Sequence, residues 1–296
     1  MALVNPKGRV NYEPNSWNGE ASGPRESPEK GFTSFPAEEE GAKLRIRSET
    51  FADHYSQARQ FYLSQTDTEQ NHIANALIFE LSKCERVAIR SRMVSHLLNI
   101  HSDLAKQVAD GLGLKEMPKA ADAARPTRED LKKSPALSIL LNGPTSFKGR
   151  KVGALITDGV DINILESLKS ALKSEGALLE IVAPKVGGVK ASDGSWIEAA
   201  QKIDGGPSVL YDAVALLPAE DGAKMLVKEP AARDFIADAF AHMKFVGYTD
   251  AAVSIMMHAG VPETRDKGFI AIKGQDDCST FVAACRQLRF WDRAKM

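Results

Sequence analysis

Apolar strands alternate with helical patterns throughout the carboxyl-terminal half of the chain, residues 149–296. Because strands separated by helices of 10–15 residues pair side by side, this alternation favours a doubly wound, mainly parallel sheet, and the fold class is α/β. The predicted strands are RKVGALI (150–156), ALLEIV (177–182), DAVALLP (212–218), FVGY (245–248) and GFIAI (268–272). The main predicted helices are 161–174, one that begins at Pro230, 251–258 and 277–293.

Two local signals refine this half of the chain. Asp193-Gly194, inside the segment 190–197, is a strong signal for a hairpin. Asp161 is well placed to cap the first predicted helix, which Gly176 would end. The sheet is therefore expected to carry a short hairpin beside its first crossover.

Residues 1–47 contain little periodic apolar pattern. The stretch 8–36 holds four prolines and four glycines among its aromatic residues, so it favours neither a helix nor a strand. We expect an extended arm that is ordered only against another surface. The aromatic anchors of that arm are Tyr12, Trp17, Phe32 and Phe35.

Residues 48–114 change to helical spacing, which predicts a small all-helical unit. Thr66 and Glu69 fit a capping box, and Ser102 is expected to cap the fourth helix, which ends at Gly111 or Gly113. The first two helices are expected to turn Phe51, Tyr55, Ala58 and Tyr62, and then Ile73, Ala76, Leu77, Leu81 and Cys84, towards the core.

Residues 115–148 have the composition of a linker, rich in alanine, charge and proline. The apolar stretch LSILL at 137–141 is expected to dock on a neighbour. The domain organisation is thus an arm (1–47), a helical unit (48–114), a linker (115–148) and an α/β domain (149–296).

Charge and composition exclude several classes of function. The 296 residues carry a formal net charge of −1, so no global field attracts nucleic acid or an anionic membrane. The sequence has no apolar run of membrane-spanning length and no secretory signal pattern at its start. Cys84, Cys278 and Cys285 fit free thiols in a reducing compartment, and the expected location is the cytoplasm.

Chemistry in an open α/β sheet is expected at the carboxyl ends of its strands. Asp158 and Asp161 follow the first strand, Glu220 follows the third, and Thr249 and Asp250 follow the fourth. Asp161 is more simply a helix cap, and Thr249 has no base in reach, since His258 lies two helical turns further on. No dinucleotide or phosphate-binding glycine motif occurs.

Other reactive residue types have simple structural interpretations. Cys278 and Cys285, seven apart on one helical face, are expected to be core thiols. The six histidines do not pair with carboxylates or cysteines at metal-ligand spacing, so no metal site is expected. The basic run at 148–151 and the group Arg86, Arg90 and Arg92 are most simply solvated surface or contacts between subunits.

The stretches RVNYEPNSW, GPRESPEKGF and the long run from FADHYSQARQFYLSQTDTEQ to SHLLNI resemble the wrapping segment and carboxyl-terminal helices of haem catalases. The α/β part resembles the flavodoxin-like domain of large-subunit catalases, which is similar to class I amidotransferases. The resemblance covers essentially the whole chain. It implies a parent that disproportionates hydrogen peroxide on haem and assembles as a tetramer.

The resemblance also implies that the catalytic parts lie elsewhere. In the family, the haem ligands belong to a β-barrel upstream of the Asn-Tyr-Glu-Pro-Asn-Ser segment, and no tyrosine here matches the family's haem-ligand motif. In this chain we therefore expect no catalytic, cofactor-binding or metal residues and no haem. The α/β domain also lacks the cysteine that active amidotransferases carry at the turn occupied here by Tyr248, Thr249 and Asp250.

Three functions follow from the sequence. The first is the non-catalytic end of a large catalase, with a structural, oligomer-stabilising role and with the catalase barrel or further subunits as partners. The second is a chaperone-like or protein-binding module, because the arm and helices would expose apolar surface. The third is a small-molecule hydrolase at the sheet edge that uses Asp158, Asp161, Thr249 and Asp250.

Overall fold

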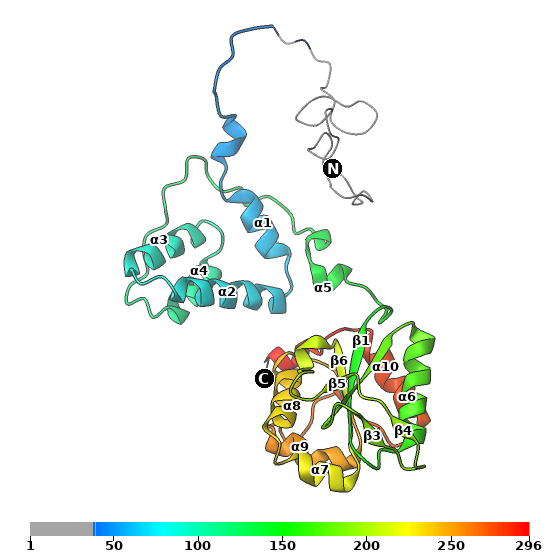
Figure 1. Ribbon diagram of the computed structural model, residues 1–296. Helices are drawn as coiled ribbons and strands as arrows, with labels where there is room; N and C mark the ends of the chain where they lie inside the picture. The colour runs from blue at the N-terminus through cyan, green and yellow to red at the C-terminus, as the bar shows by residue number, and fades with distance from the viewer. Residues whose placement is uncertain (1–37, 39, 296) are drawn as a thin grey trace, which may run out of the picture. The chain divides into compact units, whose positions relative to one another are not determined.

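The computed structural model describes residues 38 and 40–295 (Figure 1). Most of the predicted arm, including its four aromatic anchors, lies outside the described residues. Residues 40–51 are exposed, and the residues up to Phe51 form a unit separate from the rest of the chain. A short 3-10 helix, η2, covers Glu49–Ala52.

A helical unit follows, and its core is built around Tyr62, Val94, Leu97 and Leu104. The predicted capping box is confirmed: Glu69 N–H donates to Thr66 Oγ1 (3.4 Å) and Thr66 N–H donates to the Glu69 carboxylate (2.8 Å). The helices are α1 (Ser56–Ser64), α2 (Asp67–Ser82), α3 (Val87–Leu97) and α4 (Ser102–Gly111).

Three details of the helical prediction are wrong. Phe51 lies in η2 with 63% of its surface exposed, because the chain bends before α1 begins. Ala76 is exposed, since the inward face of α2 runs through Ala74 instead. The cap of α4 is His101, whose Nδ1 accepts from Asp103 N–H (3.2 Å), rather than Ser102.

The segment that follows is hydrogen-bonded to this unit through its backbone. Arg128 N–H donates to Ser56 Oγ and Ser134 N–H to Ser64 Oγ, both at 2.9 Å. Further on are η3 (Pro135–Leu137) and α5 (Ile139–Asn142). The stretch LSILL docks on α2, where Ser138 Oγ (2.8 Å) and Leu140 N–H (3.0 Å) donate to the Glu69 carboxylate. Polar groups make this contact, since Ile139 and Leu141 stay 80% and 61% exposed.

The α/β domain is a parallel six-stranded sheet in the order β5-β2-β1-β6-β7-β8. It confirms the predicted doubly wound fold and the Asp193-Gly194 hairpin, which joins β3 to β4. The strands are β1 (Lys151–Ile156), β2 (Leu178–Ala183), β3 (Val189–Lys190), β4 (Trp196–Ile197), β5 (Gln201–Lys202), β6 (Ala213–Leu217), β7 (Val246–Tyr248) and β8 (Phe269–Ala271).

Helices cover both faces of this sheet (Figure 1). α6 and α10 share one apolar core with β1, and α7, α8 and α9 share another with β6 and β7. As predicted, Asp161 caps α6 and Gly176 ends it in the left-handed conformation. The helices are α6 (Ile162–Glu175), α7 (Glu220–Leu226), α8 (Pro230–Ala241), α9 (Val253–His258) and α10 (Gln275–Cys285), with η4 (Ser208–Leu210), η5 (Asp250–Ala252) and η6 (Trp291–Lys295) as 3-10 turns.

Two features of this domain differ from the prediction. The edge strand β5 was not expected, because two residues carry no periodic pattern. The last helix ends at Cys285 rather than near residue 293, since Leu288 adopts a left-handed φ of 64° that no helix continues through. Within the described range, no helix is both long enough and apolar enough to cross a membrane.

Candidate functional site

The carboxyl ends of β6 and β7 open onto a cleft of about 470 Å³. Asp161, Glu220, Thr249 and Asp250 line this cleft together with Lys273. The structure therefore brings four of the five sequence candidates together. The fifth, Asp158, lines a neighbouring cleft of about 510 Å³ on the β2 side, where it faces Lys185 at 3.7 Å.

Two backbone donors at the ends of β6 and β7 are already engaged. Ala219 N–H donates to Thr157 Oγ1 and Thr249 N–H donates to Leu216 O, both at 3.0 Å. An oxyanion hole needs free N–H groups aimed at the developing charge. These two positions cannot supply them, and the Thr249 hydroxyl lies 3.5 Å from the same Leu216 carbonyl with no base beside it.

Two of the candidate carboxylates, Asp161 in this cleft and Asp158 in the neighbouring one, have ordinary structural roles. Asp161 accepts from Asn163 N–H (2.8 Å) and Ile164 N–H (3.3 Å), which is a helix cap. Asp158 accepts from Lys190 N–H (2.9 Å) and so holds the β3–β4 hairpin. The arrangement is a cleft with acidic walls rather than an assembled acid–base pair.

Thr157 is the residue that closes this edge of the sheet. It is 1% exposed, and a methyl group added at Gly222 would come within 1.9 Å of its Oγ1 and 2.3 Å of its Cβ. The Cβ of a β-branched residue cannot rotate away. Gly222 is thus required by the close approach of α7 to β1.

We expect Gly222→Ala to destabilise the chain by about 1–3 kcal/mol through overpacking, although alanine favours a helix more than glycine does. Urea denaturation measures the loss. The clash includes the Thr157 Cβ, so it disappears only when that atom is removed as well. Thr157→Gly with Gly222→Ala should therefore cost less than the sum of the two single variants. Additive costs in the double variant would contradict this explanation.

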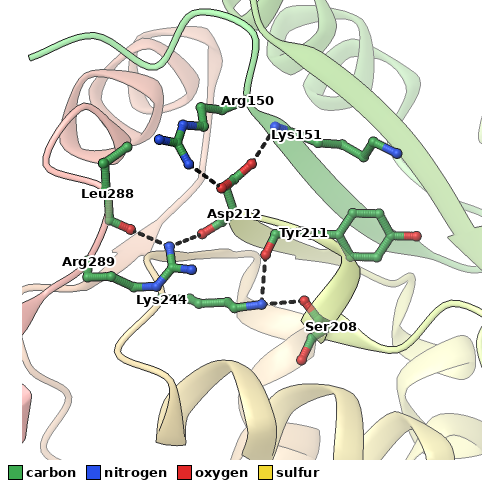
Figure 2. A network of polar contacts seen from close by, with 8 residues as sticks. All are labelled: Arg150, Lys151, Ser208, Tyr211, Asp212, Lys244, Leu288 and Arg289. Carbon is green, nitrogen blue, oxygen red and sulfur yellow. Dashed lines mark hydrogen bonds and ion pairs between the residues drawn. The ribbon is translucent and has the colours of Figure 1, made fainter. Parts of the chain in front are cut away.

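A polar network that the sequence did not reveal lies at the opposite, amino edge of the sheet (Figure 2). Lys244 is 2% exposed, and its ammonium group donates to Ser208 O and to Tyr211 O (2.7 Å). Arg289 donates to the carbonyls of Asp212 (3.0 Å) and Leu288 (2.7 Å). Both cations therefore satisfy backbone oxygens.

The Asp212 carboxylate connects this network to β1. It accepts from Arg150 Nη1 (2.9 Å) and from Lys151 N–H (3.0 Å), as Figure 2 shows. The Lys151 side chain pairs instead with Glu180 on β2. The basic run at 148–151, predicted as solvated surface or a contact between subunits, thus bonds within the domain through two of its residues.

Burial shifts the pKa values of the two cations in this network. It lowers the pKa of Lys244 to about 8, and the charge of Arg289 adds to this effect. Burial also lowers the pKa of Arg289, which Asp212 partly opposes. In the sequence, the one feature that could have pointed to a buried lysine was the position of Lys244 directly before a buried strand.

Two family profiles match the chain. "Catalase-related immune-responsive" matches residues 48–112, and "C-terminal domain found in long catalases" matches residues 148–295. The chain belongs to the catalase family. The two matches correspond to the helical unit and the α/β domain, the parts in which the sequence resemblance was found.

Characterised catalases align with nearly all of the chain. It is 57% identical to Catalase C of Rhizobium meliloti over 293 residues, which is 99% of this chain and 41% of that protein. It is 36% identical to Catalase HPII of Pseudomonas putida (97% of this chain, 40% of that protein). It is 31% identical to Catalase-2 of Bacillus subtilis (97% and 41%). The chain thus spans about two fifths of each catalase.

The described residues of this catalase chain do not fit a haem site. A haem iron needs an axial ligand that opens onto a cavity. Tyr55 is bonded to His96 Nδ1 (2.8 Å) and Tyr211 to Glu180 (3.0 Å), while Tyr62 and Tyr248 are buried. No tyrosine, histidine or cysteine lines the clefts at the ends of the sheet.

The cysteines of the catalase domain are core thiols, as predicted. Cys278 and Cys285 are 0% exposed. Burial raises the pKa of Cys278 to about 11 and raises that of Cys285 still further. Among the described residues, no group of three His, Cys, Asp or Glu could hold a metal ion.

Proposed function

We propose that this chain is the non-catalytic carboxyl-terminal portion of a catalase and that its role is structural and oligomer-stabilising. The observation that carries the proposal is the alignment of 97–99% of the chain with about two fifths of several catalases. The parent reaction is the disproportionation of hydrogen peroxide to water and dioxygen on haem. The cleft supports the proposal, because the N–H groups of Ala219 and Thr249 are bonded within the domain and are not free to bind an oxyanion.

Exposed apolar side chains on the helical unit indicate where it contacts a partner. Phe79 and Val87 are 63% and 61% exposed, and Phe61 is 46% exposed. Large apolar side chains exposed on so small a unit are typical of a protein that contacts a partner there. We propose that a haem-binding barrel or another subunit of a homo-oligomer, a tetramer in the family, covers it in the cytoplasm.

The four-part division belongs to the same proposal. The arm (1–47) reaches across a neighbour, the helical unit (48–114) packs on it, the linker (115–148) sets the spacing, and the α/β domain (149–296) adds stability. Nucleic acid and membrane are not partners in this proposal.

Haem titration and oxygen evolution test the catalytic part of the proposal. The purified chain is mixed with haemin, and we expect neither a stoichiometric Soret complex nor oxygen release from peroxide. A full-length catalase relative is the positive control. Oxygen evolution that scales with the concentration of the chain would contradict the proposal.

A second candidate is a chaperone-like module, favoured by the exposed apolar side chains of Phe79, Ile139 and Leu141. Light scattering by a heat-aggregating client protein distinguishes the two. Suppression of aggregation at equimolar chain supports the module. Unchanged scattering at molar excess supports the structural role alone. The hydrolase interpretation receives no support from the cleft.

A further inference from the structure

One edge of the sheet is open over half of strand β2. β2 pairs with β1 from Leu178 to Val182, but on its other side β5 pairs only with Val182 and Ala183. Edge strands of soluble proteins are usually covered, charged or interrupted by proline, because an open edge pairs with another chain. Leu178, Leu179 and Ile181 provide none of these protections, and the charged residue between them, Glu180, pairs with Lys151 and Tyr211 of the same domain.

The hydrogen bonds show which peptide groups face this opening. Leu178 N–H donates to Arg150 O on the β1 side (2.8 Å), and Ile181 O accepts from Ala200 N–H on the other side (2.9 Å). Because successive peptide groups of a strand alternate between its two edges, the N–H and C=O of Leu179 face outward. β5 does not reach them, and no described side chain bonds to them.

An apolar groove of about 680 Å³ runs beside this edge, between α6 and the β3–β4 hairpin. Leu178 and Trp196 on its walls are 57% and 59% exposed. Strand pairing at the edge would bring an incoming side chain into this groove. The groove and the open edge thus form one surface.

Two charged side chains mark the ends of the groove. Lys173 lies at the amino end of β2, in the last turn of α6, and Glu198 lies at the carboxyl end, two residues before Ala200. Neither has a side-chain partner of opposite charge within the described part of the chain, whereas Lys169 pairs with Glu166 (3.1 Å).

We propose that a second copy of this chain pairs with the open edge of β2, antiparallel, about a two-fold axis near Leu179. Antiparallel pairing sets the amino end of one groove against the carboxyl end of the other. Lys173 then faces Glu198 of the partner subunit, and the same contact recurs across the axis. Parallel pairing would instead set Lys173 against the partner's Lys173 and Glu198 against the partner's Glu198, so that like charges repel.

The short length of free β2 edge limits the strength of this contact. Only residues 178–181 can join the new ladder, since β5 occupies the rest of the edge. An interface of this size is smaller than that of a stable complex, so the dimer is weak and reversible. The proposal rests on the oligomer-stabilising role above and identifies a surface for it that is separate from the helical unit.

Leu179→Pro tests the strand pairing in the full chain. Proline removes only the outward N–H of Leu179 and leaves the bonds to β1 in place. Sedimentation velocity is expected to show a dimer that dissociates on dilution, with a dissociation constant raised at least about tenfold by Leu179→Pro. In hydrogen exchange, the Leu179 amide should lose its protection as the chain is diluted.

A charge exchange tests the same surface without changing the backbone. Glu198→Lys is expected to weaken the dimer about fivefold, and the double variant Lys173→Glu with Glu198→Lys to restore it. Glu263→Lys, an exposed reversal away from the groove, is the matched control and should change nothing.

The outcomes separate the two proposals. Association that none of the β2-edge variants changes overturns this inference and leaves the oligomer-stabilising role in place. A chain that stays monomeric at every concentration overturns the inference and also counts against that role. Failure of the charge exchange to restore dimerisation overturns the antiparallel arrangement.

Discussion

Replacement of Arg293 by alanine is expected to reduce the free energy of unfolding of the α/β domain by about 3–5 kcal/mol. The Arg293 guanidinium pairs with Asp266 through two bonds (2.7 and 2.9 Å) in a site where the two side chains are 3% and 9% exposed. It also donates to Lys244 O (3.0 Å). Alanine would leave the Asp266 carboxylate buried without its partner, which is costly.

Aromatic rings add to this effect. The Arg293 guanidinium lies 5.0, 4.8 and 5.7 Å from the ring centroids of Phe240, Phe269 and Phe290. These contacts explain why lysine should not substitute fully: it keeps the charge but loses the planar, two-bond geometry. Arg293→Lys should therefore fall between the wild type and Arg293→Ala.

Urea denaturation followed by tryptophan fluorescence measures these losses, and Lys224→Ala is the control. Lys224 pairs with Asp221 at 2.7 Å, and the two side chains are 74% and 96% exposed. Exposed pairs contribute less than about 1 kcal/mol. Equal losses for Lys224→Ala and Arg293→Ala would show that burial does not determine the effect.

The second large effect concerns pH and Lys244. Its pKa is about 8 in the folded chain and 10.5 when unfolded. Between these values the unfolded chain keeps the proton that the folded chain has released, so stability rises with pH, by up to about 1.4 kcal/mol per pH unit. Below pH 8 both states are protonated, and the cost of burying the charge is fully present.

Lys244→Met isolates this contribution. The variant should lack the rise, so the stability of the wild type minus that of the variant should increase from pH 8 to 10.5 by the order of 3 kcal/mol. Taking the difference removes the opposite trend from Cys278, whose raised pKa reduces stability above pH 9. The other charges near Lys244, Arg289, Asp212 and Asp238, are the same in both proteins. A constant difference across this range would contradict the assignment.

The sequence predicted those elements in which pattern and chemistry agree. α6 carries its apolar stripe between a capping Asp161 and a terminating Gly176, so both its bounds and its inward face could be predicted. The five predicted strands were equally evident, because a continuous apolar run leaves a parallel strand few alternatives.

The prediction failed where tertiary contacts overrode the pattern. Apolar residues continue at helical spacing beyond Cys285, but Leu288 turns the chain so that Phe290 packs against Phe245. Lys244 could not be identified as buried, since a lysine is normally exposed and its partners are backbone carbonyls that no side-chain pattern specifies.

The candidate site was only partly predictable for the same reason. The sequence places Asp161, Thr249 and Asp250 at one edge of the sheet, where they do lie together. It does not show that the Thr157 hydroxyl takes up the Ala219 amide. That contact joins residues 62 positions apart and depends on strand register.

The strand order has a consequence for chain synthesis. β1 is the first strand of the domain to be made, and it ends up between β2, which follows after one helix, and β6, which begins only at Ala213. While a ribosome translates the intervening hairpin and β5, one edge of β1 has no neighbour. The early β1–α6–β2 unit therefore keeps one edge of β1 and part of its apolar surface exposed until β6 is synthesised. The nascent chain is most prone to aggregate during that interval.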